Sequence, residues 1–325
     1  MMRRNFITLL GSLAVALPVA AYVAQSAERV WRIGYLSTIG QSELSESLLQ
    51  GLRESGYVEG KNLVVEFRDA AGKNERLPEL AMDLVRADLD LIVTEGTPAT
   101  KAAIEATSFI PIVFGSAQDP VEKRIVASLA HPDGNVTGLA VITNQAKPLE
   151  LLKEAVPGIS RVVFVYDPAT SPGAYGEAKL EELQTEARRL GITLQQLALR
   201  DPDETDRLFT TLPADTNGLL VHNSAINLMA HKRICELAME RRLPAVGSLR
   251  EFAVDGCLMS YGENLPDAYR RAASYVDKIL RGAKPSDLPV TQATTFDVVI
   301  NLKSAKALGL QLPATFLIRA TEVID

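Results

Sequence analysis

The sequence predicts an α/β protein built from two lobes, each with a doubly wound parallel sheet. From Trp31 onward, short apolar runs with the length of strands alternate with amphipathic segments that have the spacing of helices. Strands that alternate with helices of about 10–15 residues are typical of parallel sheets covered on both faces. About five such units precede Asn135 and about as many follow it, and a chain of 325 residues is long enough for two domains.

Turn and cap residues separate the elements of the first half. Ser42 and Asn74 are expected to cap the first two helices, because their side chains can accept hydrogen bonds from free backbone N–H groups. Thr97 as N-cap with Pro98 at the first helical position predicts the next helix. Asp119-Pro120 repeats that pattern and predicts a helix over 121–129. The predicted strands are Arg32–Leu36, Leu63–Phe67, Leu91–Val93 and Ile110–Phe114, followed by an extended segment at Asn135–Ile142.

The second half repeats the first in kind. A helix over Pro266–Arg281 is followed by a polar link with prolines at Ala283–Pro289, and the strand Phe296–Ile300 and helix Lys303–Leu308 close the chain. The earlier predicted strands of this half are Arg161–Tyr166, Ile192–Leu197, Gly218–His222, Ala245–Ser248 and Cys257–Tyr261.

Residues 1–26 have the pattern of an export signal. Arg3 and Arg4 supply positive charge, an apolar run covers Leu9–Ala21, and Ala24-Gln25-Ser26 offers small residues for a signal peptidase. The run is too short and too broken to be a stable membrane span. The paired arginines leave open a twin-arginine signal and an ordinary secretion signal. We expect an exported, soluble protein.

The composition argues against several classes of partner. The aromatic content is 6% and the net charge is −6, without the basic patch of a nucleic-acid binder. Two cysteines and three scattered histidines do not have the spacing of metal ligands, so we expect no metal and no cofactor. In an oxidising compartment, Cys235 and Cys257 either form a disulfide or stay as two buried thiols.

The sequence also lacks the motifs of common enzyme classes. No G-x-G-x-x-G follows a predicted strand, and neither G-x-x-x-x-G-K-[ST] nor G-x-S-x-G occurs. His222 is the only histidine at the end of a predicted strand, and nothing places a serine and a carboxylate beside it as a triad. We therefore expect no catalytic residues and a protein that is not an enzyme.

Short polar residues follow the predicted strands in both halves. Ligands of open α/β sheets bind beyond the carboxyl ends of the strands, so these residues are the candidate site. The helix start at Thr97 would also leave N–H groups such as that of Ala99 free to face a ligand. The same residues have structural alternatives as helix starts, core aromatics or surface groups. The candidates are Ser37, Thr38, Thr97, Pro98, Ala99, Gln118 and Asp119 in the first half, and Tyr166, Asp167, His222, Asn223 and Arg250 in the second.

Several longer segments occur together in one order. They include GLRESGYVEGKNLVVEFRDA at 51–70, RLPELAMDLVRADLDLIVTEGTPAT at 76–100, IPIVFGSAQDPVEKRIVASLAHPDGNVTGL at 110–139 and LPAVGSLREFAVDGCLMSYG at 243–262. Their order and joint presence cover essentially the whole chain. In this respect the sequence resembles the periplasmic substrate-binding proteins of ABC transporters, in the group that includes tryptophan- and phenylalanine-binding members.

The resemblance implies a type I periplasmic-binding fold, in which three chain crossings join the lobes and the ligand is shut between them. Asn135, Thr137 and Gly138 would form the first crossing, Tyr261 would lie in the second at 260–262, and the third would be near 289–293. Lobe one would comprise residues 27–135 and 265–288, and lobe two residues 136–264 and 289–325.

The implied function is capture of a small solute by hinge closure. A monomer in the periplasm would deliver an amino acid, a small organic acid, an amide or a related solute to the permease and ATPase complex at the inner membrane. In many relatives an Asp suited to an ammonium group follows the strand that matches Gly218–His222, but here the turn is His222-Asn223-Ser224. Either Asp119, Asp167 or Glu95 replaces that charge, or the ligand lacks an amine. A component of a sensing system and an exported enzyme on the same fold stay open as alternatives.

Overall fold

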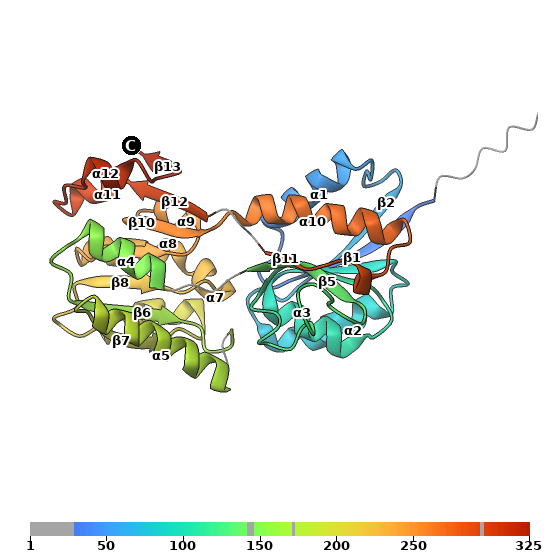
Figure 1. The fold of residues 1–325 in the computed structure, drawn as a ribbon, viewed down its shortest axis with the longest axis horizontal. Coiled ribbons are helices and arrows are strands. Elements are labelled where there is room, and N and C mark those ends of the chain that lie inside the picture. The colour runs from blue at the N-terminus through green and yellow to red at the C-terminus, as the bar shows by residue number, and fades with distance from the viewer. Residues whose placement is uncertain (1–28, 142–145, 171–172, 293–295) are drawn as a thin grey trace, which may run out of the picture.

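A computed structural model describes residues 29–141, 146–170, 173–292 and 296–325. The expected export signal, residues 1–26, lies outside this part of the chain. Two sheets, each covered by helices, form two lobes that lie side by side (Figure 1). No helix of the described residues is both long and apolar enough to cross a membrane.

The first lobe is built on a six-stranded sheet in the order β11-β5-β4-β3-β1-β2. All its strand pairs are parallel. Helices α1 and α10 cover one face and α2 and α3 the other (Figure 1). The strands are β1 (Trp31–Ser37), β2 (Leu63–Asp69), β3 (Leu91–Thr94), β4 (Ile112–Gln118), β5 (Val136–Val141) and β11 (Thr291–Gln292), and the helices are α1 (Glu43–Glu54), η1 (Asn74–Arg76), α2 (Leu77–Val85), α3 (Gly96–Ala106), α10 (Leu265–Leu280) and η3 (Pro285–Asp287).

Alternation along the strands divides the apolar side chains between the two faces of this sheet. Ile33 and Tyr35 of β1 join the core cluster that contains side chains of α1 and α10. Leu36 joins the cluster that contains side chains of α2 and α3. Gly51 lets α1 and α10 approach closely, because a Cβ there would lie 2.3 Å from the carbonyl oxygen of Arg270.

The second lobe is built on a seven-stranded sheet in the order β13-β12-β10-β9-β8-β6-β7. Its pairs are parallel except β10 with β12, so the sheets are mostly, and not entirely, parallel. The strands are β6 (Arg161–Tyr166), β7 (Thr193–Ala198), β8 (Gly218–Val221), β9 (Ala245–Gly247), β10 (Met259–Glu263), β12 (Phe296–Asn301) and β13 (Glu322–Ile324). The helices are α4 (Ala146–Ala155), α5 (Gly173–Arg189), η2 (Pro202–Glu204), α6 (Thr205–Thr210), α7 (Ala225–Met229), α8 (His231–Glu240), α9 (Arg250–Val254), α11 (Leu302–Ala307) and α12 (Ala314–Leu317).

The first crossing between the lobes does not lie where the sequence analysis expected it. Residues 136–141 form β5, which pairs with β4 inside the first sheet. Asn135 lies before this strand, where its Nδ2 donates to the carbonyl oxygen of Ile110 at 2.7 Å. Thr137 and Gly138 lie within the strand, and Gly138 has φ +149 with the carbonyl oxygen of Phe114 2.1 Å from where a Cβ would be. The chain therefore passes to the second sheet only after Val141.

The other two crossings also shift by a few residues. Tyr261 lies inside β10, stacked on Phe296 with ring centroids 5.5 Å apart, and the chain leaves the second sheet after Glu263. The strand β11 pairs with β5, so the first lobe extends to Gln292 and not only to residue 288. The chain then returns to the second sheet, where β12 and β13 lie.

Two further local features settle points that the sequence left open or predicted wrongly. Cys235 and Cys257 form a disulfide that links α8 to the segment before β10. The helix expected after Asp119-Pro120 does not form, because Asp119 has φ +42 and residues 120–129 form turns and bends. The N–H of Ile125 donates to the carbonyl oxygen of Pro120 in this turn.

Candidate functional site

A cavity lies between the two lobes, at the carboxyl ends of β1, β3 and β4 on one side and of β6 and β8 on the other. It encloses about 620 Å³, the open space at its mouth included. Of the predicted candidates, Thr38, Thr97, Pro98, Gln118, Asp167 and Asn223 line this cavity.

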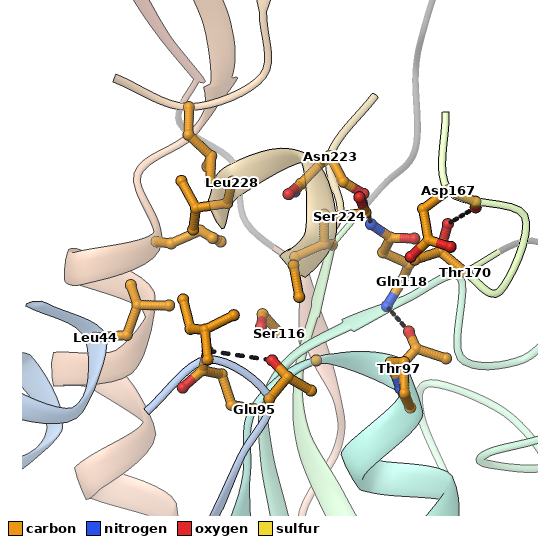
Figure 2. A pocket seen from close by; sticks show the side chains of 18 of the residues that line it. Leu44, Glu95, Thr97, Ser116, Gln118, Asp167, Thr170, Asn223, Ser224 and Leu228 are labelled. Atoms are coloured by element: carbon orange, nitrogen blue, oxygen red, sulfur yellow. Dashed lines mark hydrogen bonds between the residues drawn. The ribbon is translucent and has the colours of Figure 1, made fainter. Parts of the chain in front are cut away.

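The wall from the first lobe begins at the start of α3, which differs from the predicted helix start. The N-cap position is Glu95, without a side-chain cap bond, and Thr97 lies inside the helix. The Thr97 hydroxyl accepts the backbone N–H of Gln118 at 3.0 Å and so ties α3 to the end of β4 (Figure 2). Pro98 faces the cavity, whereas Ala99 is fully buried in the core behind it.

Glu95 is a buried carboxyl group at the floor of this wall, 3% exposed. The hydroxyls of Tyr35 and Ser37 donate to its Oε2 at 3.1 Å, and that of Thr38 donates to Oε1 at 3.4 Å. Burial raises the pKa of Glu95 from 4.5 to about 7, although these three hydrogen bonds favour the charged form and oppose the shift. Glu95 can therefore carry a proton or a negative charge near neutral pH.

The wall from the second lobe contains Asp167, which follows β6 and is 1% exposed. Its Oδ1 accepts the backbone N–H of Ala169 at 2.8 Å. In the described part of the chain its Oδ2 has no hydrogen-bond partner, although it is buried. Burial raises the pKa of Asp167, while the hydrogen bond from Ala169 and the charge of Arg200 oppose that shift.

An apolar surface forms the opposite side of the cavity. Leu44 comes from α1, Leu228 from α7, Leu249 from the start of α9 and Leu265 from α10. Figure 2 shows Leu44 and Leu228 on one side of the cavity and Asp167, Gln118 and Thr170 on the other. We call Leu44, Leu228, Leu249 and Leu265 the leucine wall. The cavity is therefore polar at one end and apolar at the other.

Among the described residues, two direct hydrogen bonds join the lobes beside the cavity. Gln118 Nε2 donates to the carbonyl oxygen of Asn223 at 3.0 Å. Lys123 Nζ, which is nearly buried, donates to the carbonyl oxygen of Thr170 at 2.8 Å and to Gln118 Oε1 at 3.3 Å. Burial lowers the pKa of Lys123 from 10.5 to about 8. These bonds show that the structure is a closed form of the two lobes.

Several predicted candidates lie outside the cavity because their side chains have other partners. Ser37 lies behind Glu95, where its hydroxyl donates to that carboxylate and accepts the N–H of Gly40 at 2.8 Å. The Tyr166 ring stacks on Phe164, with centroids 5.8 Å apart, on the side of the core that contains α4 and α5.

The remaining three candidates are also directed elsewhere. His222 is buried with its ring against Phe164 and the Thr170 hydroxyl, and desolvation lowers its pKa to about 3, so it is neutral. Arg250 forms two hydrogen bonds of 2.6 Å with Glu322. Asp119 lies in the turn after β4 and does not line the cavity.

The cavity also contains residues that the list of candidates omitted. Three of them are Ser116, near the end of β4, Thr170, in the turn after β6, and Ser224, after β8. The position at the sheet edge was a usable signal for Ser116 and Ser224. Asn74 was predicted as a helix cap, but it is the first residue of η1 and lines the cavity. The leucine wall had no signal in the sequence, because its residues resemble any core leucines. The described residues contain no cluster of three or more side chains suited to hold a metal.

The chain is similar to binding proteins of known sequence and structure. It is 25% identical over 266 residues to a tyrosine-binding protein from Clostridioides difficile (strain R20291). The aligned region covers 82% of this chain and 76% of that protein. A solved structure in complex with L-Trp from Streptococcus pneumonia has a TM-score of 0.83 and 24% identity, covering 91% of this chain and 100% of the other. A conserved domain protein from Vibrio cholerae has a TM-score of 0.84 and 28% identity with the same coverage. The model of the family described as ABC transporter substrate binding protein matches residues 34–324. The chain therefore belongs to the substrate-binding proteins of ABC transporters and has the type I periplasmic-binding fold.

Proposed function

We propose that this protein is exported, captures a small organic solute between its lobes as a monomer, and delivers it to an ABC permease and its ATPase. The observation that carries the proposal is a cavity whose polar wall comes from both lobes and is closed by direct bonds between them. Gln118 of the first lobe and Asn223 of the second both line the cavity and bond to each other. Residues 1–26 support export by their sequence pattern.

Capture works by a shift of population between open and closed forms. Only the closed form brings the wall with Thr97 and the wall with Asp167 to the same solute, so a solute that contacts both walls favours closure. A micromolar affinity requires about −8 kcal/mol in total. Several hydrogen bonds and the burial of an apolar group against the leucine wall are of that order.

The solute class follows from the cavity and from the relatives. One relative is named for binding tyrosine and one neighbouring structure holds L-Trp. An amino acid, a small organic acid, an amide or a related solute of that size fits a cavity that is polar at one end and apolar at the other. Binding without chemical conversion is part of the proposal, because the members of this family are binding proteins.

The experiment begins with the solute that the cells provide. Protein purified from the periplasm is denatured, and the released small molecules are identified by mass spectrometry. Titration calorimetry of the refolded protein then measures the affinity of that solute for the wild type, for Gln118→Ala and for Gln50→Ala, an exposed glutamine on α1. We expect Gln118→Ala to weaken binding about tenfold or more and Gln50→Ala to leave it unchanged.

Delivery is tested in cells. Uptake of the labelled solute is compared in cells with the wild-type gene, with the deletion, and with the Gln118→Ala allele. The proposal expects uptake to fall in the second and third strains. Unchanged uptake in the deletion strain would contradict delivery, and a product in place of the intact solute would contradict binding without conversion.

A further inference from the structure

We propose that Met229 is a site of reversible oxidation, and that its sulfoxide keeps the two lobes apart and so weakens capture of the solute. The proposal goes beyond the proposed function and rests on it in one respect, because closure of the lobes is the step that oxidation interrupts. It places a modification, and with it a means of regulation, at the interface of the lobes and outside the cavity lining.

Met229 reaches from the second lobe to the first. It is the last residue of α7, which lies at the edge of the second lobe that faces the first (Figure 1). Gly72 lies in the turn after β2 of the first lobe. The Sδ and Cε of Met229 lie 2.5 Å and 3.0 Å from the place that a Cβ on Gly72 would occupy. The thioether therefore packs against the backbone of the other lobe, in space that is free because residue 72 is a glycine.

Both partners of this contact are connected to the cavity. Leu228, which precedes Met229 in α7, belongs to the leucine wall. The N–H of Gly72 donates to the carbonyl oxygen of Thr38, a lining residue, at 2.7 Å. The contact between Met229 and Gly72 thus lies beside the two walls that a solute draws together, and a change in it alters closure.

A sulfoxide does not fit this contact. Oxidation adds an oxygen to the sulfur and turns an apolar group into a polar one, which costs free energy unless it finds a hydrogen-bond donor. The backbone N–H groups of residues 71–73 already donate at 2.7–3.0 Å to Asp69 Oδ1 and to the carbonyl oxygens of Thr38 and Ala70. The added oxygen of Met229 therefore finds neither room nor a backbone donor in this turn while the lobes are closed. Water satisfies it once the lobes separate.

Met229 combines access to solvent with a contact to the other lobe. Its exposed fraction is 43%, so an oxidant reaches it, whereas Met259 is fully buried in β10. Met82 is 40% exposed, but it lies on α2, which packs within the first lobe, and does not line the cavity. Met82 therefore has the access without the contact, which makes it the matched control.

The chemical step needs a two-electron oxidant of the peroxide class. A lone pair of the Met229 sulfur attacks one oxygen of hydrogen peroxide, the S–O bond forms as the O–O bond breaks, and proton transfer between the peroxide oxygens releases water. The thioether is oxidised to the sulfoxide and the peroxide is reduced to water, and methionine sulfoxide reductases reverse the change. The disulfide between Cys235 and Cys257 is typical of proteins in oxidising compartments.

The test compares the wild type with Met229→Leu, which keeps an apolar side chain of similar volume and cannot form a sulfoxide, and with Met82→Leu. Each protein is treated with hydrogen peroxide, and digestion followed by mass spectrometry gives the extent of oxidation at each methionine. Calorimetry measures the affinity for L-tyrosine, for L-tryptophan and for the compound that mass spectrometry identifies in the purified protein. Small-angle scattering of the solute-free protein measures the radius of gyration.

A further variant, Met229→Gln, places a polar side chain of similar length at the contact without any oxidant, with Met82→Gln as its control. Circular dichroism confirms that each variant is folded.

We expect peroxide to lower the affinity of the wild type and of Met82→Leu about tenfold or more, and to leave that of Met229→Leu unchanged. Methionine sulfoxide reductases A and B should restore the wild type. Met229→Gln should bind about as weakly as the oxidised wild type, and Met82→Gln should bind normally. A bound solute should slow the oxidation of Met229 but not that of Met82, because closure and modification oppose each other.

A wild type that carries the sulfoxide at Met229 and binds with undiminished affinity would overturn the inference. An equal loss of affinity in peroxide-treated Met229→Leu would do the same, as would a Met229 that stays reduced while Met82 is converted. The proposed function stands in all three cases, because the reduced wild type decides it. If the reduced wild type binds none of the three compounds, the proposed function fails. Scattering then decides the inference, which requires a larger radius of gyration after oxidation in the wild type but not in Met229→Leu.

Discussion

The buried carboxyl group of Glu95 predicts how the stability of the first lobe depends on pH. Its pKa is raised from 4.5 to about 7 in the folded protein. The folded state then holds the proton more tightly than the unfolded state, so protonation favours folding. This contribution is fully present below pH 4.5, the unfolded pKa, and is lost as the pH rises through about 7. Well above that pH the contribution of Glu95 to the free energy of unfolding no longer changes with pH.

The size of the effect follows from the same values. The difference between 4.5 and about 7, at about 1.4 kcal/mol per pH unit, corresponds to a loss of about 3 kcal/mol. Glu95→Gln has no proton to lose. Its amide oxygen can accept from the hydroxyls of Tyr35 and Ser37 in the place of Oε2, and its amide nitrogen can donate to the Thr38 hydroxyl in the place of Oε1. The variant should therefore gain about 3 kcal/mol relative to the wild type between about pH 4 and about pH 8.

Trp31 makes the measurement specific for the first lobe. It is the single tryptophan of the chain and lies in β1, in the same sheet as β3, which precedes Glu95. Urea unfolding of the solute-free protein is followed by its fluorescence at several pH values. The control is Glu105→Gln, an exposed residue of α3. If the free energy of unfolding of Glu95→Gln runs parallel to that of the wild type at all pH values, the assigned pKa is wrong.

Three further predictions concern other parts of the molecule. Replacing both Cys235 and Cys257 by Ser removes the disulfide that closes a loop with a sequence separation of 22. The free energy of unfolding of the second lobe should fall by about 3 kcal/mol. Urea unfolding followed by circular dichroism measures it, and an unchanged midpoint would contradict the prediction. Gly138→Ala places a Cβ 2.1 Å from the carbonyl oxygen of Phe114 and should destabilise the first lobe by about 2 kcal/mol or more in thermal unfolding, whereas Gly158→Ala, which meets nothing within 4 Å, should be tolerated. Lys123→Met removes the hydrogen bond between the lobes to the carbonyl oxygen of Thr170. Small-angle scattering should show a more open solute-free protein, and calorimetry should show an affinity for the solute that is about tenfold lower. Lys232→Met, at an exposed position of α8, should change neither.

Local patterns in the sequence were sufficient to predict the class of fold and the position of most elements. Ser42 occupies the N-cap position of α1 as predicted, although its Oγ does not make the expected cap hydrogen bond; its N–H donates to Ser45 Oγ instead. The predicted strand Leu91–Val93 corresponds to β3, which continues for one more residue to Thr94. Both predictions depend on short-range features of the sequence, namely a residue typical of helix starts and a buried apolar run. The alternation of strands and helices likewise depends on neighbours in the sequence.

Where the sequence predictions were wrong, contacts with residues distant in the sequence determine the local structure. The pattern Thr97-Pro98 suggested a cap, but the Thr97 hydroxyl bonds to the N–H of Gln118, which is 21 positions away. Asp119-Pro120 has the same local pattern, yet Asp119 adopts a positive φ and no helix follows. The assignment of β5 to the first sheet depends on its pairing with β4 and on contacts such as Thr137 with Leu288, which no local pattern reveals.

The site shows the same division. Sheet-edge position was enough to suggest Thr38, Gln118, Asp167 and Asn223 as lining residues, because it follows from strand ends alone. Whether such a residue faces the cavity depends on the other partners of its side chain, as the bond between Arg250 and Glu322 illustrates. Apolar lining residues could not be predicted, since they are distinguished from core residues only by the way the lobes meet.

The packing of α1 against α10 has a consequence for the order in which the chain can fold. Tyr57, three residues after α1, donates to Asp277 of α10 at 2.9 Å across 220 positions of sequence. During synthesis the first 141 residues can pair five strands, but the face of their sheet that α10 covers stays exposed until most of the second lobe has been made. Neither lobe is therefore an uninterrupted stretch of chain. A fragment meant to fold as the first lobe must join Val141 directly to Asn264 and continue to Gln292, because simple truncation leaves its core open.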